Sequence, residues 1–356
     1  MSSQNKGGLL ERLKNGGRVI CAEGYLFVFE RRGYLKAGAF VPEVVLEHPE
    51  LVRQLYREFV HAGSDVVLAF TYYAHREKLA LIDRDKDLEL MNRQALRIAR
   101  EVANETGALM AGNICNSTLF DSKHPDCQPK IDGLFKEQIA WAVEEGADYI
   151  VAETFGDLGE AMIALTAIKK YGKGLPAVIT MSLYRNVVDG KLCTLDGVEM
   201  CAAFQQLEVA GADVLGLNCA RGPATTVPLL KELKKVLKVP IAALPVVYRT
   251  TEDAPNMQVL KDPLTGKQLF PTNLDCAACT RDDIVAFGQE CLDLDIQYMG
   301  LCCGNGAHYT RTLSETIGRQ PPASKYSPDM SKHFALGDNE KLHKYNQVHV
   351  KGIVMS

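Results

Sequence analysis

The residues with the clearest chemical potential are three cysteines at the ends of two similar apolar runs. Cys302 and Cys303 are adjacent and follow the run 296–299, and Cys219 follows a comparable run that begins at residue 212. If these runs are nearby strands of one sheet, the three thiols converge at one rim. Three thiolates with a vacant fourth position are typical of catalytic zinc, because a structural zinc site is normally closed by four protein ligands.

Other interpretations of the cysteines stay open at this point. Free cysteine is a common small residue of protein cores, so each thiol could simply be packed. Cys276 and Cys279 form a further pair whose two-residue spacing is a metal or redox signature. The pair precedes an expected helix at 280–284. It could complete a metal quartet with Cys302 and Cys303, or exchange disulfides with them.

The composition indicates a large globular protein that acts on small molecules. The chain has 356 residues, 47% of them apolar, which is enough for one large α/β barrel or two ordinary domains. Its formal net charge is only −4, so no basic surface argues for nucleic acid. No apolar run reaches the ~18 residues of a membrane-spanning helix. We therefore expect neither a nucleic acid nor a membrane as partner.

The cysteine count and the start of the chain predict a reducing compartment. The chain has eleven cysteines, an odd number, and residues 1–6 contain no apolar segment that could act as a signal peptide. Clustered cysteines in a reducing compartment more often bind metal or do chemistry than form disulfides. We expect a cytoplasmic protein.

The elements that position the cysteines follow an alternating pattern. Short apolar runs alternate with amphipathic helical patterns from Arg18 to about Ile317. Near-continuous hydrophobicity is typical of parallel strands that are covered on both faces. Eight strands are expected, at residues 19–22, 65–70, 108–111, 149–152, 177–181, 214–217, 240–244 and 297–300.

Three short repeats support this count. Residues 62–65, 145–148 and 210–213 each close a helix with glycine, which supplies the left-handed turn before the next strand. Eight strand–helix units over roughly 300 residues predict a (β/α)8 TIM barrel, with a doubly wound open sheet as the alternative. We expect the barrel to span residues 8–319.

In such a barrel the catalytic residues lie at the carboxyl ends of the strands. The expected strands one, two and four end near Glu23, Tyr73 and Glu153. Strand six ends at Cys219 and strand eight at Cys303. One strand separates the last two, so their ends can face each other across the mouth of the barrel.

Two segments fall outside the alternating pattern. The loop at 244–276 contains four prolines and is expected to form a lid or an interface. From about Gln320 a proline-rich stretch is followed by polar residues. We expect 320–356 to be a C-terminal extension that wraps the barrel or contacts a second subunit of a homo-oligomer.

The chain resembles the homocysteine S-methyltransferase family, and within it the betaine–homocysteine S-methyltransferase branch. Gly216-Leu217-Asn218-Cys219 and Gly300-Leu301-Cys302-Cys303-Gly304 match the two zinc motifs of the family. The likeness runs from about Gly8 to about Ser324. Further matching segments are Glu30-Arg31-Arg32-Gly33-Tyr34, Lys36-Ala37-Gly38, Val41-Pro42-Glu43, His48-Pro49-Glu50, Phe70-Thr71-Tyr72-Tyr73-Ala74 and Ala152-Glu153-Thr154-Phe155.

The resemblance implies a cytosolic enzyme whose zinc binds the sulfur of homocysteine. Cys219, Cys302 and Cys303 are the implied metal ligands, and Tyr73 the residue that reaches the zinc when no substrate is bound. A free thiol is mostly protonated at neutral pH, whereas a metal binds it as the nucleophilic thiolate. The resemblance therefore implies methyl transfer to the homocysteine sulfur, giving methionine.

Three polar residues are implied for homocysteine itself. Glu153 matches the acidic residue that holds its amino group, although a carboxylate there could instead be a salt-bridged residue of the barrel rim. Asn218 is implied to orient a ligand or a loop through its amide, or has a structural role. Glu23 stands in for the Asp of the family's usual Asp-Gly-Gly pattern, which reads Ala-Glu-Gly in this chain.

The methyl donor must carry a good leaving group, and a quaternary ammonium or a sulfonium leaves as a neutral molecule. Aromatic faces commonly hold such onium groups. The resemblance implies Tyr25, Phe40, Tyr72 and Tyr73 for this role, against the alternative that these rings only pack.

Two departures from the betaine branch lie near the donor. That branch has a tryptophan where Phe40 stands and a tyrosine where Thr154 stands. Betaine remains the first expectation, with S-methylmethionine, a dimethylsulfonio compound or S-adenosylmethionine as sulfonium alternatives. The chain leaves no room for a cobalamin or folate domain. A thiol redox or metal-binding protein that uses Cys276 and Cys279 is the hypothesis from a different class.

Overall fold

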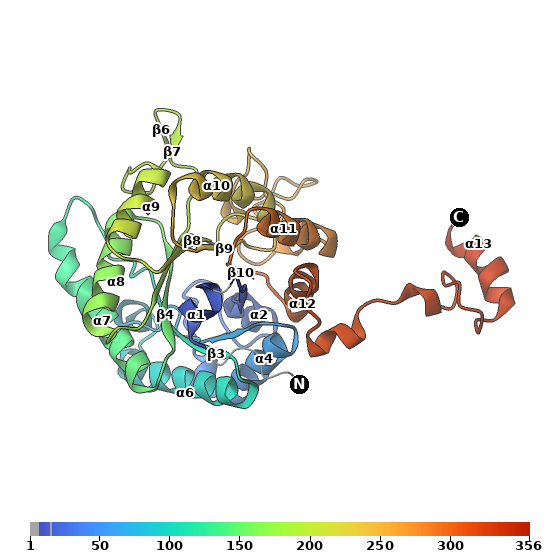
Figure 1. The fold of residues 1–356 in the computed structure, drawn as a ribbon, viewed down its shortest axis with the longest axis horizontal. Helices are drawn as coiled ribbons and strands as arrows, with labels where there is room; N and C mark the ends of the chain where they lie inside the picture. The colour runs from blue at the N-terminus through green and yellow to red at the C-terminus, as the bar shows by residue number, and fades with distance from the viewer. Residues whose placement is uncertain (1–6, 15) are drawn as a thin grey trace.

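The computed structural model describes residues 7–14 and 16–356, and in it eight parallel strands close into a barrel (Figure 1). The order around the barrel is β1-β10-β9-β8-β5-β4-β3-β2. The predicted (β/α)8 barrel is confirmed, and its closure excludes the open doubly wound sheet. The strands are β1 (Val19–Ala22), β2 (Val66–Leu68), β3 (Leu109–Cys115), β4 (Tyr149–Phe155), β5 (Ala177–Met181), β8 (Val214–Asn218), β9 (Ile241–Leu244) and β10 (Tyr298–Leu301).

β3 and β4 each continue three or four residues past their predicted ends at 111 and 152. The predicted strands end early because the polar residues Asn113 and Glu153 interrupt the apolar run. Both side chains are nonetheless buried. Polar residues inside these strands therefore mark the mouth of the barrel and not the end of the sheet.

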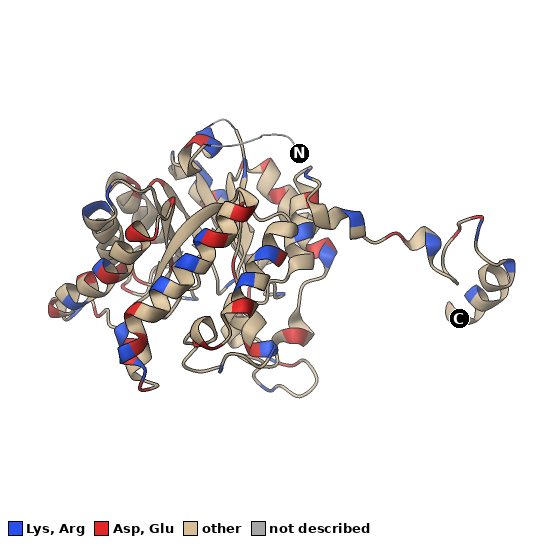
Figure 2. Ribbon diagram, turned by 90° about the horizontal axis from the view of Figure 1, so that it is seen from below, with Lys and Arg blue, Asp and Glu red and all other residues tan. Residues whose placement is uncertain are grey.

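An outer ring of helices covers the barrel (Figure 1). In α4, for example, the apolar residues Val52, Leu55 and Phe59 are buried, while charged residues recur along the outward parts of the helices (Figure 2). The ring consists of α4 (Pro49–His61), α6 (Leu88–Thr106), α7 (Gln128–Glu144), α8 (Leu158–Tyr171), α9 (Met200–Val209), α10 (Pro223–Val236), α11 (Arg281–Asp293) and α12 (Ala307–Thr316).

Shorter elements complete the described part of the chain. They are α1 (Leu9–Lys14), α2 (Tyr25–Arg31), α3 (Val44–Glu47), α5 (Arg76–Ala80), α13 (Lys351–Val354) and a hairpin of β6 (Val187–Val188) with β7 (Lys191–Leu192). Helix α2 follows β1 directly and lies at the mouth of the barrel, where Leu26 and Phe27 reach the cavity described below. None of the described helices is long and apolar enough to cross a membrane.

The three glycine repeats have a second, polar function. Each glycine has the expected positive φ, 114° at Gly63, 82° at Gly146 and 93° at Gly211. The aspartate two positions later accepts a hydrogen bond from the backbone of a neighbouring strand. The three bonds are Ile20 N–H to Asp65 (2.8 Å), Met110 N–H to Asp148 (2.6 Å) and Ala177 N–H to Asp213 (2.8 Å). The repeat thus fastens each helix–strand junction to the barrel strand that precedes it in the chain.

The proline-containing loop after β9 packs over the carboxyl end of the barrel. Its apolar residues Val246, Met257 and Leu269 form a second small core together with Phe27 of α2 and the vicinal cysteines. The loop was expected to form a lid or an interface, and the structure places it as a wall beside the thiols.

The C-terminal segment leaves the barrel. Up to Ser327 it stays attached, because Arg311 donates to the carbonyl oxygen of Tyr326 at 3.2 Å and Arg319 pairs with Asp65. Beyond this point the chain projects away from the barrel (Figure 1). Residues 1–6, for which no signal peptide was expected, lie outside the described residues.

Candidate active site

Three thiols meet at the carboxyl ends of β8 and β10, with β9 between the two strands. The sulfur atoms of Cys219 and Cys303 are 3.6 Å apart, and those of Cys302 and Cys303 are 3.9 Å apart. A tetrahedral zinc ion with Zn–S bonds of ~2.3 Å separates its thiolates by about 3.8 Å. The predicted convergence of the three cysteines is therefore found, and their spacing suits a metal ion.

The backbone fixes the thiols against the strand between them. Cys219 and Ala220 both have left-handed backbone angles, with φ of 56° and 52°, which turn the chain sharply after β8. The N–H of Cys219 donates to the carbonyl of Leu244 at 3.0 Å, and the N–H of Cys302 donates to the carbonyl of Pro245 at 2.8 Å. The end of β9 thus holds both halves of the cluster.

The thiols share one negative charge readily. Hydrogen bonds from Cys302 and Cys303 lower the pKa of Cys219 well below its usual value, since both thiols stabilise the Cys219 thiolate. The same arrangement raises the pKa of Cys302 and of Cys303, because each thiol would have to ionise beside that thiolate. A divalent cation removes this conflict by stabilising all three thiolates.

A small inner cavity of about 50 Å³ reaches the thiols from within the barrel mouth. Glu153 at the end of β4 lines it, and both of its oxygens are held. Asn113 Nδ2 donates to Oε1 at 2.6 Å and Asn218 Nδ2 donates to Oε2 at 2.9 Å. Burial raises the pKa of Glu153 to about 7. Glu153 forms no ion pair with the described residues, so it is not a salt-bridged rim residue.

Glu23 lines the same cavity, close to Cys302 and without an ion pair in the described part of the chain. Both of its carboxylate oxygens are buried and accept no hydrogen bond from the described part of the chain. Burial, and then the charge of Glu153, raise the pKa of Glu23 well above its usual value. Ligand atoms of Glu23, Glu153 and Cys302 all lie within 4.8 Å of one another. A cationic group bound here would stabilise both carboxylates.

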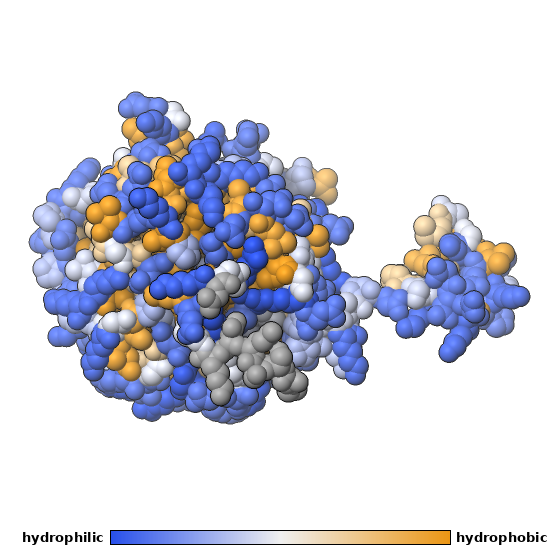
Figure 3. Space-filling model, in the orientation of Figure 1, coloured by the Kyte–Doolittle hydropathy of each residue, from blue (hydrophilic) through white to orange (hydrophobic). Residues whose placement is uncertain are grey.

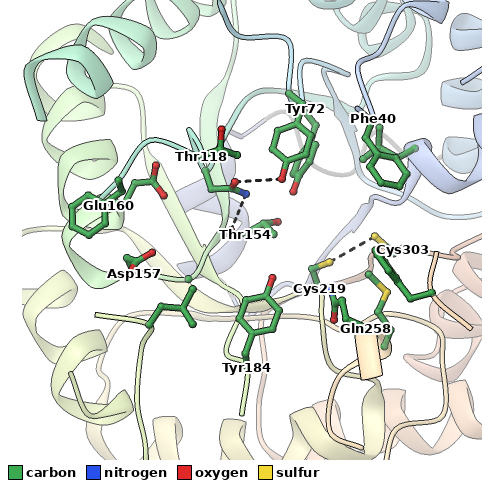
Figure 4. A pocket seen from close by; sticks show the side chains of 18 of the residues that line it. Phe40, Tyr72, Thr118, Thr154, Asp157, Glu160, Tyr184, Cys219, Gln258 and Cys303 are labelled. Carbon is green, nitrogen blue, oxygen red and sulfur yellow. Dashed lines mark hydrogen bonds between the residues drawn. The ribbon is translucent and has the colours of Figure 1, made fainter. Parts of the chain in front are cut away.

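A larger outer cavity of about 320 Å³ has Cys219 and Cys303 in its wall (Figure 4). The two cavities share five lining residues, which are Leu26, Tyr72, Thr154, Cys219 and Cys303. The cysteines therefore stand at the junction, where groups bound in the two cavities can react with each other.

Aromatic side chains form much of the outer cavity. Of the predicted donor residues, Phe40, Tyr72 and Tyr73 line it. The rings of Tyr72 and Tyr73 lie 4.4 Å apart at 51°, and the Tyr73 hydroxyl donates to Asn116 Oδ1 at 3.3 Å. Such faces attract a cationic methyl compound.

The structure does not bring Tyr25 to the outer cavity. Its side chain lines the inner cavity, where the ring contacts Tyr56 and Phe70 edge-on at 5.4 and 5.5 Å. The Tyr25 hydroxyl donates to the carbonyl of Ala22 at 3.0 Å. This residue therefore packs beneath the site, while the other three predicted aromatic residues surround the larger space.

Sequence reasoning missed several polar lining residues, among them Asn116, Thr118 and Gln258 of the outer cavity. Asn113 lies in the unrecognised end of β3, and Tyr184 follows β5, where extending that strand to its mouth would have found it. Asp157 and Glu160 flank the start of α8 and line the outer cavity. The only sequence signal for the last two is their place just after strand four.

Cys276 and Cys279 take no part in the cluster. Cys276 is exposed and its thiol donates to the carbonyl of Asn273, whereas Cys279 is buried, which raises its pKa to about 12. Within the described residues, neither belongs to a group of three or more potential metal ligands. The alternative metal quartet is therefore not formed, and all eleven cysteines are free.

Comparison with known proteins adds the family. Residues 25–317 match the family profile described as homocysteine S-methyltransferase. The chain belongs to that family. This confirms the resemblance drawn from the two cysteine motifs, and the enzymatic class is that of a homocysteine S-methyltransferase.

Two curated members of the family differ in the donor that they are named for. Betaine–homocysteine S-methyltransferase 1 of Xenopus tropicalis is 33% identical over 347 residues, covering 95% of this chain and 82% of the relative. An S-methylmethionine–homocysteine S-methyltransferase of Mus musculus is also 33% identical over 347 residues, covering 96% of this chain and 89% of the relative. Equal identity to both leaves the donor undecided.

Solved structures support the fold. The metallated form of a homocysteine methyltransferase from Escherichia coli superposes with a TM-score of 0.66 at 16% identity, over 85% of this chain and 98% of that one. At this identity the likeness shows the shared barrel.

Proposed function

We propose that this protein transfers a methyl group from an onium donor to the sulfur of homocysteine, giving methionine, with zinc held by Cys219, Cys302 and Cys303. One observation carries the proposal. Three thiols with the spacing of metal ligands lie where a small acidic cavity meets a larger aromatic one. An acceptor in the first cavity and a donor in the second would meet at the thiols.

The ligand set fits zinc. Thiolates are soft ligands, and three protein ligands with an open fourth position are the pattern of catalytic zinc. Bound there, zinc would hold the homocysteine sulfur as the thiolate, with the thiol proton released to solvent. The thiols must stay reduced for this chemistry, in agreement with the reducing compartment predicted from the sequence.

The inner cavity is suited to the amino group of homocysteine. In the proposed complex the ammonium pairs with Glu153, whose orientation is set by the amides of Asn113 and Asn218. Glu23 supplies a second carboxylate that otherwise has no partner. Charge-assisted hydrogen bonds of this kind are stronger than neutral ones, so both acids would ionise when the substrate binds.

The outer cavity is suited to the donor. A bond forms between the homocysteine sulfur and the methyl carbon while the bond from that carbon to the donor's nitrogen or sulfur breaks. The electron pair of the broken bond stays on the donor, which leaves as a neutral amine or thioether. Phe40, Tyr72 and Tyr73 would hold the positive charge before transfer. The sequence favours betaine as the donor, with sulfonium compounds as the alternative.

A donor screen tests the proposal. Purified protein is supplied with homocysteine and, in separate reactions, betaine and S-methylmethionine, and methionine is measured together with the zinc content. We expect about one zinc per chain, loss of methionine formation after chelation, and recovery on adding zinc back. Metal-loaded protein that forms no methionine with any onium donor would contradict the proposal.

We also propose that residues 320–356 contact a second copy of the chain. The part of this extension beyond Ser327 projects from the barrel and bears exposed apolar side chains (Figures 1 and 3). Phe334 and Val348 are among them. A chain that ends after Ser327 should have a smaller mass by light scattering than a full-length oligomer. If the shortened and the full-length chains have the same number of subunits, the extension does not mediate the contact.

A further inference from the structure

The outer cavity has an acidic end. Asp157 and Glu160 line it, and none of the described residues that line this cavity is lysine, arginine or histidine. The ammonium group of Lys78, which is outside the lining, lies over the ring of Tyr73, 4.1 Å from its centre. The thiols and Phe40 lie at the opposite side of the cavity from these two carboxylates (Figure 4). A donor whose methyl group faces the thiols therefore directs its far end towards the acids.

The carboxylate of Asp157 is not used by the fold. Aspartate at the first position before a helix usually accepts a hydrogen bond from the helix backbone, but the Asp157 side chain makes no such bond to α8. Asp196 takes this role instead, accepting from the N–H groups of Leu158 at 2.9 Å and Gly159 at 2.8 Å. Asp157 has no ion pair or hydrogen-bonded side-chain partner among the described residues, so its charge remains available to a ligand.

Glu160 supports the same end of the cavity. Its side chain is only 3% exposed, yet it lines the cavity and forms no ion pair. Oε1 accepts hydrogen bonds from the N–H of Ser117 at 2.7 Å and from the Ser117 hydroxyl, while Oε2 accepts none. Oε2 is not one of the fully buried atoms that lack a partner, so it opens onto the cavity. A ligand with a cationic group at this end would pair with it as well as with Asp157.

We propose that Asp157, supported by Glu160, binds an ammonium group at the far end of the methyl donor. The donor is then an amino-acid sulfonium, with the sulfonium methyl at the thiols and the α-ammonium at Asp157. This rests on the proposed methyl transfer and specifies its donor class. Betaine fits less well, because it has no ammonium group to offset its carboxylate beside the two acids, and no basic residue is in the lining.

Two donors that differ in one group provide the test. S-methylmethionine and 4-(dimethylsulfonio)butanoate have the same sulfonium and the same carboxylate, and only the first has the α-ammonium. In the wild-type protein we expect kcat/KM for S-methylmethionine to exceed that for its deaminated analogue by roughly tenfold or more, the usual size of a hydrogen bond to a charged group. Betaine should be no better than the analogue.

Asp157→Asn removes the charge and keeps the shape. It should lower kcat/KM for S-methylmethionine by roughly tenfold and leave that for the analogue nearly unchanged. The ratio of the two kcat/KM values should therefore fall towards one. Asp189→Asn, the same substitution in the exposed β6–β7 hairpin, is the matched control and should keep the full preference. Glu160→Gln retains an acceptor for Ser117 and should reduce the preference by a smaller factor.

The outcomes separate this inference from the proposed function. A wild-type enzyme that uses betaine or the deaminated sulfonium as well as S-methylmethionine overturns the inference, while the proposed methyl transfer stands. Equal losses for both sulfonium donors in Asp157→Asn also overturn it, since the residue would then only shape the cavity. Failure to make methionine from any donor instead contradicts the proposed function.

Discussion

The two cavities that meet at the thiols are built differently. Side chains at the ends of strands line much of the inner one, where Glu153 is fixed by amides from β3 and β8. The outer one is larger and draws on segments between elements, including Phe40 and the loop that carries Met257. Residues on strands are held by the sheet, whereas residues on loops vary more easily. The barrel therefore fixes the acceptor side rigidly and leaves the donor side open to change.

Cys219 and Cys303 line both cavities and Cys302 lines the inner one, so loss of any of these thiols should stop the reaction whichever cavity a ligand occupies. Replacing Cys219, Cys302 or Cys303 with alanine should release the metal and lower methyl transfer by more than about 100-fold, beyond the effect of losing an outer-shell partner. The fold should survive, because the thiols lie at the rim and not in the packed layers of the barrel. Metal analysis and circular dichroism measure both effects.

Cys276→Ala is the control for these variants and should keep metal and activity, because Cys276 is exposed and outside the cluster. If all three rim variants retain metal and activity, the cysteines are not the metal site.

The variant Glu153→Gln tests the proposed role of the inner cavity in binding homocysteine. We expect the KM for homocysteine to rise by roughly 10- to 100-fold, because the ammonium loses its charged partner while the shape is kept. The KM for the donor should change little. A thiol acceptor without the amino group, 4-mercaptobutanoate, should be affected least. An unchanged KM for homocysteine would remove Glu153 from the acceptor site.

The outer cavity should respond to pH through Asp157. Burial, with the nearby carboxylates of Asp196 and Glu160, raises the pKa of Asp157 to about 6. Only the ionised carboxylate binds an ammonium group, so the preference for S-methylmethionine over its deaminated analogue should be present above this pKa and decline as the pH falls through it. Competition between the two donors at several pH values measures the ratio.

A second carboxylate near Asp157 has a pKa displaced in the same direction. Burial raises the pKa of Glu160 too, so the ratio is also measured in Glu160→Gln. Asp196 accepts hydrogen bonds from the start of α8, and burial keeps the Tyr184 phenol neutral by raising its pKa. Asp157→Asn should show a much flatter ratio across the same pH range. A wild-type ratio independent of pH would mean that Asp157 does not recognise the donor's charge.

The smallest effect is expected at the aromatic wall. Phe40→Leu should weaken a charged donor by about 0.5–2 kcal/mol, the usual strength of a cation–π contact, and a neutral analogue of the same shape by less. Binding of the two ligands can be compared by calorimetry. Equal losses would show that Phe40 only packs, as its contact with Phe27 at 5.9 Å would then suggest.

The inner cavity could be predicted from the sequence better than the outer one. The eight strands, the thiol cluster and the position of Glu153 could be predicted because apolar runs end where a barrel opens, and a motif at a strand end has few places to lie. Asn113 was missed because a polar residue inside a strand resembles the end of that strand.

The donor side was harder to predict for a physical reason. Tyr25 and Phe40 are both aromatic residues near the mouth. The first begins α2 and lines the inner cavity, whereas the second lies after that helix, with a left-handed φ of 55°, and lines the outer one. Asp157 resembles an ordinary helix cap in the sequence. Its release from that role depends on Asp196, thirty-nine positions away, which no local pattern reveals.

Asp196 caps α8 in place of Asp157, so stabilising the helix and contacting a ligand fall to different residues. Because Asp196 stabilises the start of α8, position 157 can mutate with little effect on folding. Descendants of such a barrel can therefore explore new donors by drift at one site, without a prior compensating mutation. With Asp157 in its proposed role, the arrangement makes donor choice an evolvable trait, and residue 157 is the first position to randomise when the donor is to be changed by design.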